Sequence, residues 1–83
     1  MANAIELTPG NSGSFPTSAG PAPTTVQADN LENAWGKLTI IAGAANEDVD
    51  LKPSDHATLA RSWWGMPITN KNVGRTRVKV WTA

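Results

Sequence analysis

The stretch Arg-Thr-Arg-Val-Lys-Val-Trp-Thr, residues 75–82, decides the fold class of this chain. Its side chains alternate with a period of two, which is the period of a β-strand and not of a helix. One face would carry small and apolar groups, and the other would carry basic groups and Trp81. The first face consists of Thr76, Val78, Val80 and Thr82, and the second consists of Arg75, Arg77, Lys79 and Trp81. The sequence therefore predicts a strand with one buried and one exposed side.

The same period recurs in the residues before this strand. Leu38, Ile40 and Ala42 share one face of the segment 37–42, and a shorter alternation covers residues 49–51. We predict a loop over residues 43–48, a turn at Pro53-Ser54-Asp55 and a third alternating segment over residues 56–64. Pro67 limits residues 66–69 to an edge strand or a bulge, and residues 70–74 favour a hairpin loop. These segments predict an all-β fold, a small antiparallel β-sandwich or barrel of 4–5 short strands.

The N-terminal third differs in composition. Residues 8–25 consist mainly of Thr, Pro, Gly, Ser and Ala, and such a stretch buries too little apolar surface to offset its own ordering. We therefore expect residues 1–33 to form an extended polar arm and residues 34–83 to form the β-domain. Residues 27–35 fit either a single helical turn or a continued extended lead-in.

Composition excludes several classes of protein. The chain of 83 residues has no cysteine, so disulfides and thiolate zinc sites are absent. Its longest apolar run is far shorter than the ~20 residues of a membrane-spanning helix, and its first residues do not resemble a secretory signal. The formal net charge is zero, whereas strong nucleic-acid binders usually show a basic excess. We expect no membrane and no nucleic acid among its partners.

Candidate catalytic and metal-binding residues are few. His56 is the only histidine, and its neighbours Ser54 and Asp55 in sequence are not placed for mutual hydrogen bonding. The acidic run around Asp48 and Asp50 lacks the glycine and the ligand number of a calcium loop. We expect no catalytic residue, no metal and no cofactor, and hence a protein that is not an enzyme.

Four tryptophans and no tyrosine are the unusual feature of the sequence. Trp63 and Trp64 are adjacent, so within a strand they face opposite ways, and we expect one in the core and the other at a subunit contact. Trp81 should lie against a neighbouring subunit or beneath Arg75 or Arg77. Tryptophan and arginine are enriched at protein-binding hot spots. An exposed tryptophan platform for carbohydrate is the alternative. A third hypothesis is a small bacterial regulator that binds nucleic acid through the last strand, where Arg75, Arg77 and Lys79 could follow the phosphates.

A domain of about fifty residues without disulfides or a metal site has marginal folding stability, and this favours oligomerisation. The segment GKLTIIAGAANEDVDLKPSDHATLARSWWGMPI, with VGRTRVKVW after it, resembles the small β-sandwich accessory proteins of tailed-phage virions, of the decoration or head-fibre type. The resemblance implies a capsid decoration or cement protein located in the virion, with an arm running over the major capsid protein. It leaves the pair Trp63-Trp64 unexplained. The partner-binding residues expected on this reading are Ile5, Leu7, Phe15, Trp64, Arg75, Arg77 and Trp81.

Overall fold

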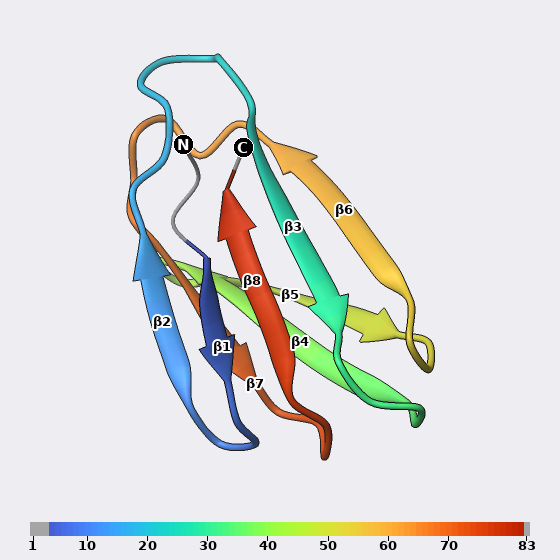
Figure 1. Ribbon diagram of the computed structural model, residues 1–83. Coiled ribbons are helices and arrows are strands. Elements are labelled where there is room, and N and C mark those ends of the chain that lie inside the picture. The colour runs from blue at the N-terminus through green and yellow to red at the C-terminus, as the bar shows by residue number, and fades with distance from the viewer. Residues whose placement is uncertain (1–3, 83) are drawn as a thin grey trace.

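The computed structural model describes residues 4–82 and contains only β-structure in that range, so none of its elements is a helix able to cross a membrane. Eight strands follow one another along the chain (Figure 1). They are β1 (Ile5–Leu7), β2 (Ser12–Phe15), β3 (Thr24–Asn30), β4 (Gly36–Ala42), β5 (Ala45–Leu51), β6 (His56–Arg61), β7 (Ile68–Asn72) and β8 (Val78–Thr82).

The strands form two antiparallel four-stranded sheets that pack face to face. The first sheet has the order β1-β8-β3-β6 and the second has the order β2-β7-β4-β5. Eight strands in this order make a jelly roll. Four of the pairings are nested around the turn Gly43-Ala44: β4 pairs with β5, β3 with β6, β2 with β7 and β1 with β8. The predicted all-β sandwich is confirmed, but with eight strands in place of four or five.

The core lies between the sheets and draws on both halves of the chain. Val78 and Val80 are fully buried, and Leu38 and Ile40 face them from the second sheet with almost no exposure, as their alternation predicted. The remaining buried apolar side chains are Leu7, Phe15, Val26, Ala28, Leu51 and Ile68. Because β1, β2 and β3 contribute to this one core, the described residues 4–33 are not separate from residues 34–82.

The expectation of an arm over residues 1–33 is therefore wrong for its described part, residues 4–33, and residues 1–3 lie outside the described residues. Strand β2 pairs with β7, and β3 pairs with both β6 and β8. These partners satisfy the backbone hydrogen bonds, so the segment needs few apolar side chains of its own. The helical turn considered for residues 27–35 is absent, because residues 24–30 belong to β3.

Three local expectations in the second half also change. The predicted loop over residues 43–48 is only the two-residue turn Gly43-Ala44, in which Gly43 has a φ of 61°, as the first position of a type II′ hairpin turn requires. Pro67 precedes a central strand, since β7 lies between β2 and β4. Residues 70–72 belong to β7 and not to a hairpin loop.

Two buried asparagines on β7 differ sharply in their partners. The Asn72 side-chain amide donates to the carbonyl oxygens of Leu7 and Thr76 at 2.8 and 2.6 Å, and its oxygen accepts from the Gly74 backbone N–H at 3.1 Å. Asn72 therefore ties β7 to β1 and to the turn before β8. Asn70 is equally buried, but neither its side-chain nitrogen nor its oxygen has a hydrogen-bond partner in the described part of the chain.

Candidate functional site: two tryptophan surfaces

Three of the predicted partner-binding residues are buried in the core or packed against it. Leu7 and Phe15 are buried in the core, and Ile5 packs against it, with its side chain over Gly13. Their prediction as exposed anchors of an arm is wrong, because β1 and β2 are strands whose inward side chains fill the sandwich.

The basic residues before β8 do not assemble into one surface with the tryptophans. The guanidinium of Arg77 lies 3.7 Å from the Glu32 carboxylate and 4.0 Å from that of Glu6, and the same Glu32 carboxylate accepts the Arg77 backbone N–H at 2.6 Å. Arg75 is exposed in the turn between β7 and β8, far along the strand from Trp81. The positive charge of Arg77 is thus offset by neighbouring carboxylates, which weakens the phosphate-binding reading.

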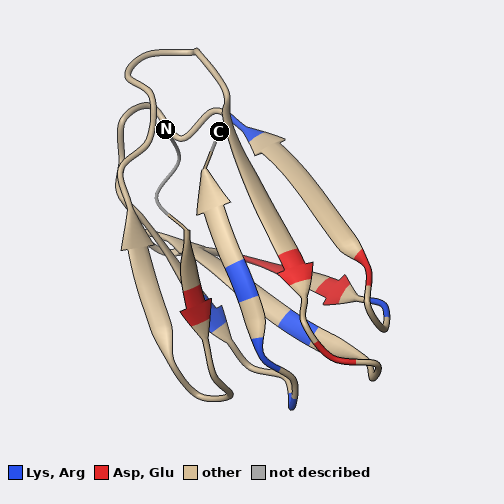
Figure 2. Cartoon of the chain, in the orientation of Figure 1, with Lys and Arg blue, Asp and Glu red and all other residues tan. Residues whose placement is uncertain are grey.

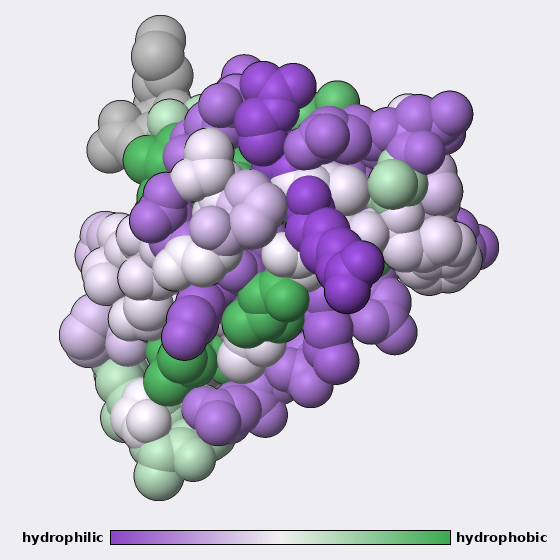
Figure 3. Space-filling view, turned by 90° about the horizontal axis from the view of Figure 1, so that it is seen from below, coloured by the Kyte–Doolittle hydropathy of each residue, from purple (hydrophilic) through white to green (hydrophobic). Residues whose placement is uncertain are grey.

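Charge is unevenly distributed between the two ends of the sandwich. Figure 2 shows most acidic and basic residues in the lower part of the molecule, where the turn before β8 and the β3–β4 and β5–β6 connections lie. Seen from below in Figure 3, that end is covered mainly by hydrophilic residues with a few hydrophobic groups between them. The upper end differs in its lack of charged side chains.

We call that upper surface the uncharged end; it comprises residues 16–23, 43–44 and 62–67, none of which is Asp, Glu, Lys or Arg. Two hydrogen bonds join its two long loops: Thr17 Oγ1 donates to the Met66 carbonyl at 2.7 Å, and Ser62 Oγ donates to the Pro21 carbonyl at 2.6 Å. Met66 covers the β4–β5 turn, since a Cβ on Gly43 would lie 3.2 Å from its sulfur. The uncharged end is therefore one continuous, internally bonded surface.

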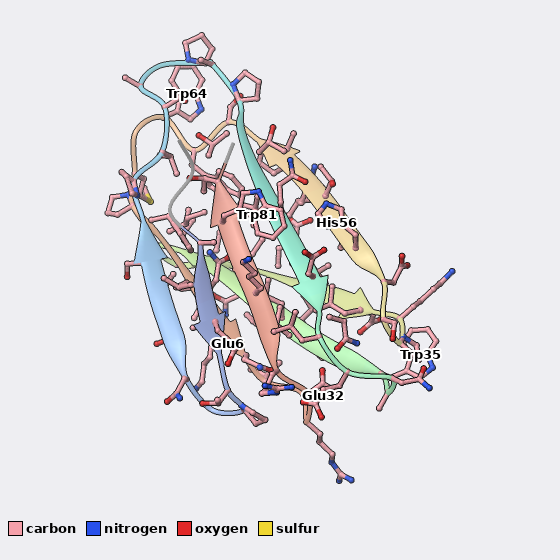
Figure 4. The ribbon with its side chains drawn as sticks, viewed as in Figure 1. Glu6, Glu32, Trp35, His56, Trp64 and Trp81 are labelled. Carbon is pink, nitrogen blue, oxygen red and sulfur yellow. The ribbon has the colours of Figure 1, made fainter. Side chains whose placement is uncertain are left out.

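Trp64 lies at this end of the molecule (Figure 4). It is 69% exposed, and its neighbour Met66 is 48% exposed. Trp64 and Gly65 have φ values of 57° and 80°, and the Met66 N–H donates to the Trp63 carbonyl at 2.9 Å. These features fit a type I′ turn, whose central positions favour Asn and Gly. A bulky residue with a left-handed backbone is uncommon and points to a function for its side chain.

The two adjacent tryptophans do point apart, but for a different reason from the one predicted. Strand β6 ends at Arg61, and Trp63 and Trp64 belong to the turn that follows. Trp63 is partly buried and packs against the core, whereas Trp64 faces away from it. The strand predicted over residues 56–64 is therefore three residues too long, because the turn supplies the reversal of direction.

The second tryptophan surface is the outer face of the sheet β1-β8-β3-β6. Trp81 lies there with a partly exposed ring, and its cross-strand partner on β3 is Gln27. The ring centroids of Trp81 and His56 are 5.5 Å apart, with a tilt of 45° between the planes. The expectation that Trp81 lies beneath Arg75 or Arg77 is not met within the chain, because His56 occupies that role.

His56 is held by two oxygen atoms on β3. Its Nδ1 contacts a carboxylate oxygen of Asp29, and its Nε2 lies 2.6 Å from Gln27 Oε1. Thr58 donates to the same Gln27 oxygen at 3.3 Å. Within residues 4–82, no three of the His, Asp and Glu side chains come close enough together to hold a metal ion. The arrangement fixes the orientation of the His56 ring on the outer face of the sheet.

Comparison with known proteins places the chain among relatives without assigned activities. A family model described as "Family of unknown function (DUF8244)" matches residues 5–83. Two uncharacterized proteins of Dictyostelium discoideum are 38% and 35% identical over 85 residues, and each alignment covers 100% of both chains. The resemblance to phage decoration proteins stays a prediction.

Two solved structures share the fold. A de novo designed double-stranded β-helix, solved by NMR, has a TM-score of 0.57 and is 13% identical, with 99% of this chain and 95% of that chain covered. The crystal structure of PirA has a TM-score of 0.61 and is also 13% identical, with 99% and 93% covered. At this level of identity the likeness supports the jelly roll and nothing finer.

Proposed function

Since the chain belongs to DUF8244, a family of unknown function, we propose its function from its geometry: it is a non-enzymatic interaction module that self-associates through its uncharged end. The observation that carries the proposal is Trp64, a residue that is 69% exposed on a backbone that disfavours bulky side chains. Large exposed aromatic rings are typical anchors of protein interfaces. The capsid role expected from the sequence depended on a free arm, so the proposal retains assembly and names no particle.

The local strain at Trp64 supports a role outside folding. Glycine would adopt the φ of 57° without a steric penalty, whereas a residue with a Cβ in the left-handed region is disfavoured by ~1–2 kcal/mol. The ring does not recover this energy within the monomer, because most of its surface remains in water. A contact that buries the ring would recover it, at ~25 cal/mol for each Å² of apolar surface removed from water.

A second copy of the chain is the partner that the charge distribution favours. A two-fold contact brings the same patch of both subunits together, so a patch with a net charge would face a copy of the same sign. The uncharged end avoids this repulsion. Arg61, which precedes residues 62–67 in sequence, is paired with Glu47 at 2.9 Å, so it adds little free positive charge to attract an anionic lipid surface. Self-association therefore suits this end better than binding to such a membrane.

The test is sedimentation equilibrium of the wild-type chain and of Trp64→Gly between roughly 10 μM and 1 mM, the range of weak, small interfaces. We expect a reversible wild-type dimer and a Trp64→Gly monomer, because the variant removes the anchor and relieves the backbone. Trp35→Ser is the matched control: Trp35 is 61% exposed but lies at the charged end (Figure 4). It should dimerise like the wild type.

Folding stability separates loss of contact from loss of structure. In denaturant, Trp64→Gly should be as stable as the wild-type monomer or more so, and Trp64→Ala should be less stable than Trp64→Gly by ~1 kcal/mol. A wild-type chain that stays monomeric over the whole concentration range would refute the proposal. Equal dissociation of the Trp35 and Trp64 variants would do the same.

A further inference from the structure

Trp81 lies on the outside of the sandwich by strand alternation. Val78 and Val80 on β8 are fully buried, so the residues between and after them, Lys79 and Trp81, point outward. β8 is a central strand, paired with β1 on one side and β3 on the other. The indole therefore sits over the middle of a rigid sheet and not on a loop.

The ring is part of an arrangement that spans three strands. Trp81 on β8 and His56 on β6 are separated by β3, yet their ring centroids are only 5.5 Å apart. Both rings must lean over β3 to meet, as the labelled side chains in Figure 4 show. Asp29 and Gln27 on β3 hold the imidazole in that position through its two nitrogens.

Polar groups of both kinds surround the indole. The register forms a row from Glu6 through Lys79 and Asp29 to His56, across all four strands of the sheet. The charges of Glu6, Lys79 and Asp29 alternate in sign along the row, and His56 adds two ring nitrogens, so the face carries both donors and acceptors. Such a row also stabilises the sheet by cross-strand attraction, and this is the purely structural explanation of the charges.

The structural explanation does not account for the aromatic part. Stacking on His56 leaves the Trp81 ring partly exposed on an otherwise polar face, where a Thr or Val would suit a strand equally well. A flat apolar ring with fixed polar atoms beside it is the combination that recognises a ligand with an apolar face and a polar rim. Pyranose sugars have this form, with C–H groups on the faces of the ring and hydroxyls around its edge.

We propose that the outer face of the sheet β1-β8-β3-β6 binds a neutral oligosaccharide of pyranose units, with one sugar ring stacked on Trp81. A neutral ligand suits this face, because Glu6, Lys79 and Asp29 alternate in sign and form no patch of one charge for an ionic group. The row of Trp81, Gln27 and Thr58 runs across two strand spacings, ~10 Å, about the length of a disaccharide. The site is independent of the uncharged end and does not rest on the proposed self-association.

The test uses isothermal titration calorimetry with cellotetraose, chitotetraose and maltotetraose, which are neutral pyranose chains of different shape. At least one should bind to the wild-type chain, and Trp81→Ala should weaken that binding ~tenfold or more, as the loss of an aromatic anchor does. Trp81→Phe keeps an aromatic packing residue in case the alanine variant folds poorly, and it should bind with intermediate affinity. His56→Ala should bind more weakly, because the indole loses its support.

The control is Trp64→Gly, which leaves the outer sheet face intact and should bind the sugar like the wild type. A titration-dependent shift of the Trp81 indole N–H signal, with the Trp64 indole signal unmoved, would place the sugar on this face. No binding of any of the three probes to the wild-type chain would overturn the proposal. So would unchanged binding by a folded Trp81→Ala variant.

Discussion

Two asparagines on one strand have opposite energetic roles. Asn72 makes three hydrogen bonds, two of them to backbone carbonyls that are otherwise far apart in sequence. Asn70, two positions earlier and just as buried, makes none with its side chain in residues 4–82. A buried polar group without partners loses its hydrogen bonds to water, and no hydrogen bond within the protein replaces them. A buried polar group with partners stabilises the segments that it joins.

We therefore predict opposite results for the same substitution at the two sites. Asn70→Leu should raise the free energy of unfolding by ~1–3 kcal/mol, because it removes an unpaired polar group and keeps the branching and number of side-chain heavy atoms. Asn72→Leu should lower that free energy by a similar ~1–3 kcal/mol, because the carbonyls of Leu7 and Thr76 lose their donor. Urea unfolding of both variants measures this. Loss of stability in Asn70→Leu would contradict our account of Asn70.

At the scale of elements, sheet pairing explains which strands the sequence predicts and which it does not. β4 and β8 alternate apolar and polar residues, so the patterns around Leu38 and Val78 indicate strands at once. β3 has the inward residues Thr24, Val26, Ala28 and Asn30, which are too small or too polar to show an alternation in hydropathy. β3 is a strand because it pairs with β6 and β8. The sequence of residues 24–30 does not indicate these pairings.

The central position of β8 leads to a prediction about charge. Lys79 stands between Glu6 and Asp29 in the outer row, so Lys79→Glu would place three acids side by side. We expect the unfolding free energy to fall by ~1 kcal/mol at low salt. Part of this loss should be recovered at ~0.5 M salt, because salt screens the repulsion between the three carboxylates. Lys71→Glu is the matched control on β7, because its cross-strand neighbours are Ser12 and Thr39. An equal, salt-independent loss in both variants would exclude the charge row as the cause.

At the scale of the molecule, the division into an arm and a domain is replaced by a single sandwich. Composition suggested that residues 8–25 could not be ordered, and by themselves they cannot. The core nevertheless takes Leu7, Phe15 and Val26 from the N-terminal third, and β7 and β8 supply its hydrogen bonds. The exposure of Trp64 could be predicted from the sequence. The hydrogen bonds that join its loop to residues 16–23 could not, because they connect segments far apart in the chain. The contact of Trp81 with His56 could not be predicted either, because it depends on how β8, β3 and β6 are paired.

Truncation tests the single sandwich directly. A chain lacking residues 1–23 would keep every strand that the sequence predicted, yet it would lose β1 and β2 and leave β7 and β8 with unpaired edges. We predict that it does not fold, because it lacks Leu7 and Phe15 and exposes the apolar side chains that they cover. Amide chemical-shift dispersion by NMR measures this. A dispersed spectrum from the truncated chain would restore the arm-and-domain description.

The nesting of strand pairs around Gly43-Ala44 has a consequence for how the chain is made. The ribosome releases β1, β2, β3 and β4 before any of their nested partners exists, and β1 waits longest, because β8 is the last strand to emerge. Only β4 finds its partner immediately, across a two-residue turn. During synthesis the early strands therefore remain solvated chain, and the scarcity of large apolar residues in this Pro-, Ser- and Thr-rich third protects the nascent protein from premature aggregation.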